Sequence, residues 1–407
     1  MEPTFALRRD PPIGLDDVGE EADLAERIRD EIRRNGPMPF ARFMELVLYD
    51  PDGGYYRGST ARPGRVGDFI TGPELDPIFG ATLSTGIIEI WARLGRPDPF
   101  TIRELGAGVG TLALAILRAI EDEAFRTAVR YQVVEVDPRR ATAATDALAA
   151  AGFGDVIVPD DGRAMVGVVL ANEVLDALPV HRVRQRPTGL VELAVELAVD
   201  GTLREVEIAP TTDKLAARLA DEEVVLVDGQ TAEICLGLDA WLRDAVAPLD
   251  RGTLLLIDYG APAAELYDPV RRRDGTLRAY VRHQVHDDPY RHVGRQDLTA
   301  HVDVTAVERT ATAAGLATLG ITTQMEALVG LGIEGRWTAL RDDPATTLET
   351  YTAARASISR LLDPASMGRF RVMAFGRDWP TAGQQDANDD HEEPLTMFAF
   401  RLPTGRR

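Results

Sequence analysis

The spacing of apolar and polar residues divides the chain into a helical N-terminal part and a longer part in which strands and helices alternate. Apolar residues recur with helical spacing in three early segments, 23–32, 40–48 and a longer one that continues through Trp91. The sequence Asn35-Gly-Pro37 ends the first of them, as turn residues do. We therefore expect a helical cap region over 21–100, after a loose tail at 1–20.

From residue 101 onward, short apolar runs of strand length alternate with helical segments. The runs lie at 101–105, 131–136, 155–158, 166–171, 253–259, 317–322 and 370–375, and the helical segments include 231–247 and 303–314. Strands that alternate with helices in this way form a doubly wound, mostly parallel sheet with right-handed crossovers. The pattern predicts an α/β domain over 101–378 that is built on a seven-stranded sheet.

Two stretches interrupt this alternation and are expected to be insertions. The first, at about 186–230, contains segments of strand character on both sides of the turn dipeptide Asp200-Gly201, which predicts a hairpin. The second, at 261–302, is polar, rich in Arg, His and Asp, and too long for a plain connection, so it is expected to carry function or structure of its own. A C-terminal tail at 379–407 contains an acidic segment, Gln384 to Glu393.

The composition excludes several classes of protein. The formal charge of −20 argues against nucleic-acid binding, which needs clustered basic residues. No apolar run approaches the ~18 residues of a membrane-spanning helix, and the first residues lack the apolar core of a signal peptide. A single cysteine, Cys235, rules out internal disulfides and a thiol-based zinc cluster. We therefore expect a cytoplasmic protein that is not inserted in a membrane.

The glycine-rich loop between the first two predicted strands is the strongest sign of a ligand. Glycines 106, 108 and 110 lie between a strand that contains Glu104 and a helix that starts near Thr111. Glycine lets a ligand approach the backbone closely, and the start of the helix supplies unpaired N–H groups. Glu135, near the end of the second strand, can accept hydrogen bonds from both ribose hydroxyls. Together these residues predict a cofactor that contains a nucleoside.

The details of the loop favour S-adenosylmethionine over a nicotinamide cofactor. Nicotinamide sites prefer a third glycine that packs the helix on the strand, and Thr111 stands in that place. The acid Glu104, just before the loop, suits a sulfonium cofactor with an amino-acid tail. We therefore expect S-adenosylmethionine to bind at Glu104, Gly106, Gly108, Gly110 and Glu135, and a nicotinamide oxidoreductase is the weakest alternative.

Seven segments of the chain resemble the MidA-like class I methyltransferases. They are 67–74, 104–112, 171–181, 255–260, 275–280, 296–303 and 367–374, and they occur in the expected order between about residues 20 and 378. The resemblance implies a Rossmann-like methyltransferase sheet with S-adenosylmethionine as the cofactor. The family includes a mitochondrial enzyme that assists assembly of respiratory complex I and dimethylates an arginine, so a protein acceptor, such as a respiratory-complex subunit, is implied. The acceptor of bacterial-type members is less settled.

Three further residues are candidates for cofactor binding. Asp68 and Thr71 lie in a loop that the resemblance suggests could close over the cofactor, although Asp68 could equally cap the helix that follows. Asn172, directly after the strand at 166–171, could serve the methionine part of the cofactor or only the architecture of its loop.

Glu173 and Asp176 are the candidate catalytic residues. A protonated guanidinium is a poor nucleophile, and carboxylates that bind two of its edges localise positive charge away from the attacking nitrogen. Both acids follow the fourth strand and could form such a clamp, or they could cap the next helix. The leading hypothesis is protein-arginine methylation. The alternatives are a small-molecule methyltransferase and an assembly factor that acts mainly by binding a partner protein.

The histidines do not form a convincing site. His181, His283 and His301 are each possible general bases, but a lone histidine is more often structural. If residues 297–303 were helical, Asp297 and His301 would share one face, yet a persuasive set of metal ligands is missing. We expect no metal.

Overall fold

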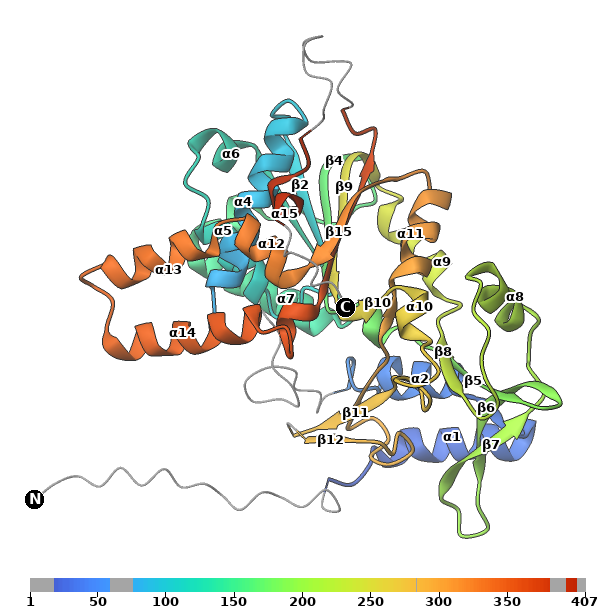
Figure 1. The fold of residues 1–407 in the computed structure, drawn as a ribbon. Coiled ribbons are helices and arrows are strands. Elements are labelled where there is room, and N and C mark those ends of the chain that lie inside the picture. Colours follow the sequence, from blue (N-terminus) through green and yellow to red (C-terminus); the bar gives the residue numbers. More distant parts are fainter. Residues whose placement is uncertain (1–17, 59–75, 283, 381–392, 401–407) are drawn as a thin grey trace, which may run out of the picture.

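The computed structural model describes residues 18–58, 76–282, 284–380 and 393–400, and it combines a large sheet covered by helices with a lower part built from smaller sheets (Figure 1). Several predictions fall outside the described residues. They concern Asp68 and Thr71, His283, nearly all of the tail at 1–20, and the acidic segment apart from Glu393.

The main sheet has six strands among the described residues. Their order is β15 (Ala317–Thr323), β16 (Arg371–Arg377), β9 (Leu249–Asp258), β4 (Met165–Asn172), β2 (Phe100–Leu105) and β3 (Val129–Val134). The pairs from β9 to β3 are parallel, whereas β16 runs antiparallel to both of its neighbours. The predicted α/β architecture is confirmed, but the sheet is mixed.

The prediction of seven strands is not confirmed. The run expected as a strand at 155–158 makes only one isolated parallel bridge, between Tyr131 and Ile157. The reason is local, because the chain leaves α7 (Pro138–Leu148) through a π-helical turn, Ala149–Phe153, and a 3-10 turn, Gly154–Val156. Little extended backbone remains to pair with β3.

Helices cover both faces of the main sheet, as the alternation of side chains along its strands requires. Ile102, Val168 and Leu255 belong to one core with helices α4 (Ile78–Arg93), α5 (Thr111–Arg118), α6 (Glu123–Ala128), α12 (Gln324–Gly330), α13 (Ile333–Asp342), α14 (Leu348–Leu362) and α15 (Thr396–Ala399). Val169 and Leu254 belong to the opposite core, with α9 (Leu238–Val246) and α11 (Val304–Ala313). The sheet is therefore buried between two layers of helices.

The first insertion forms a second sheet together with the N-terminal residues. Its strands are β1 (Met38–Pro39), β6 (Gly189–Leu197), β5 (His181–Arg186), β8 (Thr231–Ile234) and β7 (Leu203–Ile208). Strands β6 and β7 are the predicted hairpin around Asp200-Gly201, and α8 (Lys214–Asp221) follows it. The helix expected over 231–247 is wrong in its first part, because β8 precedes α9.

The second insertion, at 261–302, carries short elements that pack against the N-terminus. They are β10 (Gly260–Ala261), α10 (Ala263–Leu266), β11 (Arg278–Val281), β12 (Gln284–His286), β13 (Asp297–Thr299) and β14 (Val302–Asp303). Helices α1 (Ala22–Asn35) and α2 (Phe40–Tyr49) share a core with β11 and β13. The helices of the expected cap region therefore do not form one unit. Helix α4 packs on the main sheet, whereas α1 and α2 pack on this insertion.

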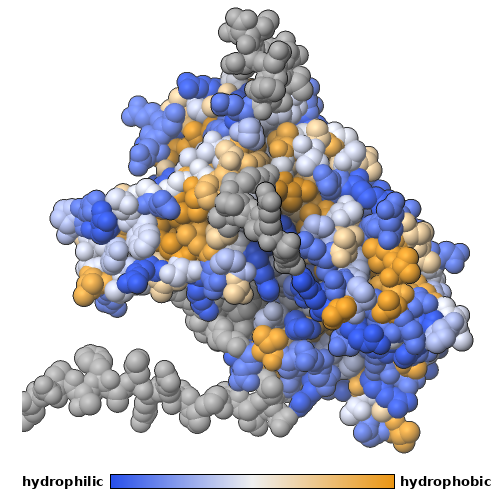
Figure 2. Space-filling model, viewed as in Figure 1, coloured by the Kyte–Doolittle hydropathy of each residue, from blue (hydrophilic) through white to orange (hydrophobic). Residues whose placement is uncertain are grey.

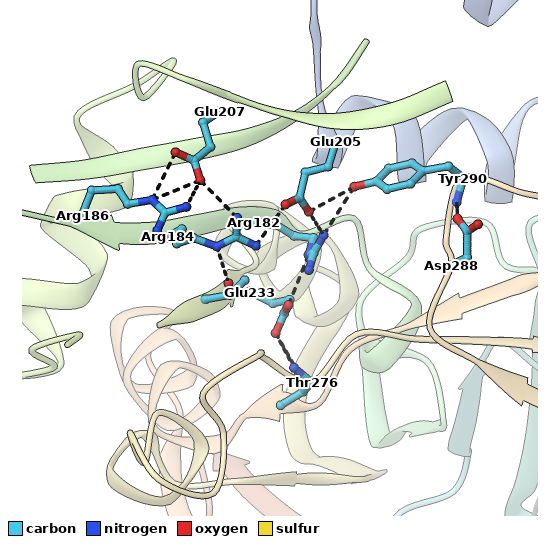
Figure 3. Close-up of polar contacts among 10 residues, drawn as sticks. Arg182, Arg184, Arg186, Glu205, Glu207, Glu233, Thr276, Asp288 and Tyr290 are labelled. Carbon is cyan, nitrogen blue, oxygen red and sulfur yellow. Dashed lines mark hydrogen bonds and ion pairs between the residues drawn. The ribbon is translucent and has the colours of Figure 1, made fainter. Parts of the chain in front are cut away.

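A ladder of alternating arginines and glutamates crosses the second sheet (Figure 3). This arginine–glutamate ladder consists of Arg182, Arg184 and Arg186 on β5, Glu205 and Glu207 on β7, and Glu233 on β8. Arg182 lies 2.7 Å from Glu205 and 3.4 Å from Glu233, and Arg184 lies 3.0 Å from Glu205. Each arginine of the ladder thus contacts at least one carboxylate.

The surface is predominantly polar around the lower sheets in the view of Figure 2, with hydrophobic residues more prominent beside the main sheet. Among the helices of the described residues, none is both long enough and apolar enough to cross a membrane.

Candidate functional site

A cavity of about 390 Å³ lies at the carboxyl ends of β2, β3 and β4. β2 has β3 on one side and β4 on the other, so the cavity lies where the strand order reverses, which is where open α/β sheets bind ligands. The lining comes from the glycine loop, the ends of these strands, α2 and α9, and it includes Tyr49, Tyr56, Glu104, Gly106, Gly108, Glu135, Arg140, Asn172, Glu173, Ala177 and Trp241.

The glycine loop has the geometry that close approach of a cofactor requires. Gly106, Gly108 and Gly110 have φ angles of 69°, 58° and 82°, which side chains disfavour. A Cβ on Gly106 would lie 2.7 Å from a methyl carbon of Val174, whereas one on Gly108 would meet only Arg140, at 3.9 Å. Gly108 therefore faces open space, and α5 begins directly after Gly110. The loop fits a nucleoside cofactor.

Glu135 stands beside the glycine loop, as predicted for a ribose-binding acid. One of its carboxylate oxygens accepts a hydrogen bond from the N–H of Gly108 at 2.8 Å. The other accepts from the N–H of Val136 at 2.9 Å. The second oxygen also accepts from the N–H of Asp137 at 3.3 Å. These contacts fix the carboxylate at the rim of the cavity, and the oxygen bonded to Gly108 keeps a lone pair for a ribose hydroxyl.

Glu104 is a buried acid that makes no ion pair with any described arginine, lysine or histidine. The hydroxyl of Tyr131 donates a hydrogen bond of 2.7 Å to Glu104. Burial raises the pKa of Glu104 to about 8, and the charge of Glu135 adds to the rise while the Tyr131 hydrogen bond opposes it. A positively charged part of a ligand in this cavity would therefore be stabilised by the ionised form of Glu104.

The turn after β4 is held by Asp258, at the end of β9. One oxygen of Asp258 accepts hydrogen bonds from the backbone N–H groups of Val174 and Leu175 at 3.1 Å and 2.8 Å. Asp258 is fully buried, and burial is the main reason why its pKa is raised. The negative charges of Asp176 and Glu173 raise the pKa further. Sequence analysis missed this residue, although its place at the end of a buried strand was a usable signal.

The two predicted catalytic acids occupy different environments. Glu173 lines the cavity with a φ angle of 53°, and the side-chain amide of Asn172 donates a hydrogen bond of 3.1 Å to it. Asp176 is buried, does not line the cavity, and bonds to the hydroxyl of Tyr259. Burial raises the pKa of Asp176 to about 6, against the effect of that hydrogen bond. Only Glu173 is thus in contact with the cavity.

Two tyrosines form an aromatic wall of the cavity that sequence analysis did not find. The rings of Tyr49 and Tyr56 stack with centroids 5.6 Å apart and planes inclined by 27°. Tyr49 donates its hydroxyl hydrogen to the carbonyl of Ala177 at 2.9 Å, and Tyr56 donates to Asp297 at 2.8 Å. Because both hydroxyls have partners, the groups that the tyrosines present to the cavity are their rings.

None of the histidines that the structure describes lines this cavity. His181 lies 2.7 Å from Glu192, and burial together with neighbouring arginines lowers the pKa of His301 to about 3. Asp297 lies in strand β13, so the helical arrangement considered for Asp297 and His301 is wrong. Among the residues that the structure describes, no group of three or more His, Cys, Asp or Glu is placed to hold a metal ion.

The chain matches a known protein family over residues 82–322, which is more than half of its length. The family is described as "Putative S-adenosyl-L-methionine-dependent methyltransferase". The chain belongs to this family. A crystal structure of a "likely methyl transferase" from Burkholderia thailandensis bound to S-adenosyl-homocysteine is 33% identical, with a TM-score of 0.80, and the match covers 91% of this chain and 96% of that one. The protein is therefore an S-adenosylmethionine-dependent methyltransferase, and the predicted cofactor is confirmed.

Curated relatives match most of the chain at lower identity. The "Protein arginine methyltransferase NDUFAF7 homolog, mitochondrial" of Drosophila melanogaster is 28% identical over 412 residues, which are 91% of this chain and 90% of that protein. The human "Protein arginine methyltransferase NDUFAF7, mitochondrial" is also 28% identical, over 85% of this chain and 81% of its own.

These relatives overturn the expected cytoplasmic location. Their names place them in mitochondria, and this finding contradicts the prediction. The prediction rested on the single cysteine and on the first residues of the chain. A low cysteine count indicates a reducing environment, but it does not distinguish one reducing compartment from another.

Proposed function

We propose that this protein methylates an arginine side chain of another protein. The observation that carries the proposal is the position of Glu173, whose carboxylate lines the cofactor cavity together with the stacked rings of Tyr49 and Tyr56. The names of the curated relatives support an arginine acceptor. As the family resemblance implies, subunits of respiratory complexes are the first acceptors to test.

The proposed chemistry assigns a separate task to each part of the cavity. S-adenosylmethionine, when bound, supplies the methyl group. Gly108 and Glu135 would hold the nucleoside, and Glu104 would lie near the positively charged part of the cofactor. The protein then has to position the acceptor nitrogen in line with the methyl group and to exclude water.

Glu173 would act on the acceptor. A guanidinium spreads its positive charge over three nitrogens, and a carboxylate on one edge concentrates the charge there. The nitrogen on the opposite edge then becomes a better nucleophile. Asp258 supports this role because its hydrogen bonds to the following backbone keep the turn in place. Asp176, which is buried behind the cavity, would contribute by holding the turn through Tyr259.

The aromatic wall suits the same acceptor. A guanidinium is planar and cationic, and it packs favourably against tyrosine rings. Because the hydroxyls of Tyr49 and Tyr56 are already bonded, they would not compete for the guanidinium hydrogens.

The test is to find the methylated product. The purified protein is incubated with isotope-labelled S-adenosylmethionine and mitochondrial or bacterial lysate, and the labelled species are identified by mass spectrometry. We expect label on arginine within a protein. Label confined to a small molecule would contradict the proposal and would establish the small-molecule alternative.

A pair of variants links the activity to Glu173. Glu173→Gln keeps an oxygen for the hydrogen bond from Asn172 but removes the charge, so we expect transfer to fall by at least about a hundredfold while S-adenosylhomocysteine still binds. Glu334→Gln, an exposed change on α13, is the matched control and should retain activity. Equal activity of both variants would remove Glu173 from the chemistry.

A further inference from the structure

Three arginines from separate segments lie around His301, beside the carboxyl edge of the main sheet. Arg272 follows α10, Arg278 begins β11, and Arg369 ends the 3-10 turn that precedes β16. We call these three residues the arginine cluster. They occur in a chain whose net charge is −20, so a local excess of positive charge needs an explanation.

The backbone brings Arg272 and Arg278 to His301. Arg278 is the register partner of Thr299 in the β11–β13 pair, two residues before His301. The N–H of His301 donates a hydrogen bond of 3.1 Å to the hydroxyl of Thr276. Thr276 follows directly on the turn that contains Arg272, because the carbonyl of Arg272 accepts the N–H of residue 275.

Ring contacts bring Arg369 to the same place. The next residue, Phe370, has its ring centroid 5.3 Å from that of Tyr259. The ring of Tyr259 in turn lies 5.3 Å from that of His301, in an edge-on arrangement. Segments that are far apart in the sequence therefore converge on one histidine.

The cluster has little compensating negative charge. Among the described residues, neither Arg272 nor Arg369 makes an ion pair with a carboxylate, and Arg278 lies 3.8 Å from the highly exposed Asp287. Burial and the charges of the other two arginines lower the pKa of Arg272, opposed by Glu233. Burial lowers the pKa of His301 most, and the three arginines lower it further. This histidine is therefore neutral and adds no charge.

The cluster lies next to the acceptor side of the cavity. Tyr259, which contacts His301, also bonds to Asp176, and the following residue, Ala177, lines the cavity. The three arginines line neither this cavity nor the small one beneath His301. Arg369 is exposed, whereas Arg272 and Arg278 are half-buried. Because these guanidinium groups come from three segments and line neither cavity, they suit an extended ligand with several negative groups better than a single enclosed ion.

The described residues that flank the acidic segment 384–393 lie at the end of the main sheet that is opposite to the arginine cluster. Arg377 pairs with Gly252, near the start of β9, and the carbonyl of Glu393 accepts a hydrogen bond from Arg93, at the end of α4. Asp258, by contrast, pairs with Arg371 at the edge where the cluster lies. The described flanks of the segment thus lie at the other end of the strands from the cluster.

We propose that the arginine cluster binds an acidic segment of the protein acceptor and so holds the target arginine at the cavity; the identification of the ligand as the acceptor rests on the proposed function. Carboxylates from aspartate or glutamate side chains would pair with the guanidinium groups of Arg272, Arg278 and Arg369. The net charge of the protein repels acidic partners in general, so the cluster would select where on the surface such a segment docks.

The test uses a fluorescein-labelled peptide of eight glutamates, whose binding to the full chain is followed by fluorescence anisotropy. We expect saturable binding that weakens with salt. The double variant Arg272→Gln/Arg369→Gln should weaken it by about tenfold, as loss of two partly exposed charge pairs would. Arg163→Gln, an exposed arginine near the start of β4, is the control and should bind the peptide like the wild type.

Three results would overturn the proposal. The first is no peptide binding, or equal weakening by the control variant. The second is that inorganic phosphate displaces the peptide at millimolar concentration, which indicates a site for small oxyanions. The third is tighter peptide binding after the acidic residues of 384–393 are replaced by serine, which indicates that the chain's own segment occupies the cluster.

The experiment separates this proposal from arginine methylation. Peptide binding needs no methyl transfer, so its absence would reject the cluster and leave the proposed reaction standing. S-adenosylhomocysteine affinity is measured on the same variants and is expected to stay unchanged, because the cluster does not line the cofactor cavity. If the peptide binds as expected but the label is found on a metabolite, the cluster does not serve a protein acceptor and that assignment fails.

Discussion

The arginines of the arginine–glutamate ladder and those of the arginine cluster are equal in number but differ in their partners. In the ladder, Arg182, Arg184 and Arg186 each contact a glutamate, and these contacts join three strands (Figure 3). In the arginine cluster, Arg272 and Arg369 make no ion pair with a described carboxylate. Charges that are neutralised within the fold hold elements together, whereas charges without such partners are available to a ligand.

The same contrast applies to the acids at the main sheet. Glu233 of the ladder contacts Arg182, whereas Glu104 at the cavity is also buried and has, among the described residues, the hydroxyl of Tyr131 as its hydrogen-bond partner. Its pKa is raised to about 8 as a result of burial. The edge of the main sheet thus combines arginines without described ion pairs and a buried acid that a bound cation would ionise, and we interpret these as the binding surfaces for acceptor and cofactor.

The largest expected effect is the loss of a buried ladder contact. Arg182→Gln leaves the buried Glu233 without its arginine and leaves Glu205 with Arg184 alone, so we expect the free energy of unfolding to fall by about 3 kcal/mol. Urea denaturation measures it. Arg186→Gln is the matched control, and because Arg186 is more exposed it should cost less than about 0.5 kcal/mol. If both variants lost the same unfolding free energy, burial would not distinguish the ion pair of Arg182 from that of Arg186.

The next effect concerns cofactor binding. Glu135→Ala removes the proposed partner of the ribose hydroxyls and also frees the N–H of Gly108, so S-adenosylhomocysteine affinity should weaken by about 1–3 kcal/mol. Titration calorimetry gives the value. Asp146→Ala, an exposed change on α7, should leave the affinity as it is. Unchanged affinity of Glu135→Ala would remove this residue from the cofactor site.

A smaller effect concerns pH and Glu104. The folded-state pKa of about 8 lies above the ordinary value of 4.5, so the folded protein holds this proton more tightly than the unfolded chain. The contribution to stability is complete below pH 4.5 and is lost as the pH rises to about 8. We expect the cofactor-free protein to lose unfolding free energy over this range because of Glu104 alone.

Comparison with Glu104→Gln isolates that contribution. Asp176 and Glu222, whose pKa values are raised to about 6 and about 8, act in the same direction and remain in both proteins. The difference between the two urea midpoints should therefore change steadily between pH 5 and pH 8. A constant difference would show that Glu104 titrates normally in the folded protein.

The two halves of the site differed in how far the sequence could predict them. The cofactor half is built from one contiguous strand, loop and helix, and from Glu135 at the end of the next strand. Both features depend on local rules for glycine and for strand ends, so they were recognisable in the sequence.

The acceptor half depends on contacts between distant segments. Tyr56 bonds to Asp297 across 241 residues, and the aromatic wall exists only because α2 packs on the second insertion. Similarly, Asp258 and the turn after β4 meet through the register of β4 and β9. Such pairings follow from tertiary packing, which apolar spacing alone does not specify.

The most direct test of this account is the proton balance of cofactor binding at Glu104. S-adenosylmethionine is titrated into the protein at pH 7 in two buffers with different ionisation enthalpies. We predict release of about one proton per cofactor bound from the wild type, because a cation in the cavity would ionise this carboxyl, and none from Glu104→Gln. Equal heats in both buffers for the wild type would contradict the claim that the buried carboxyl of Glu104 serves to bind the positively charged cofactor.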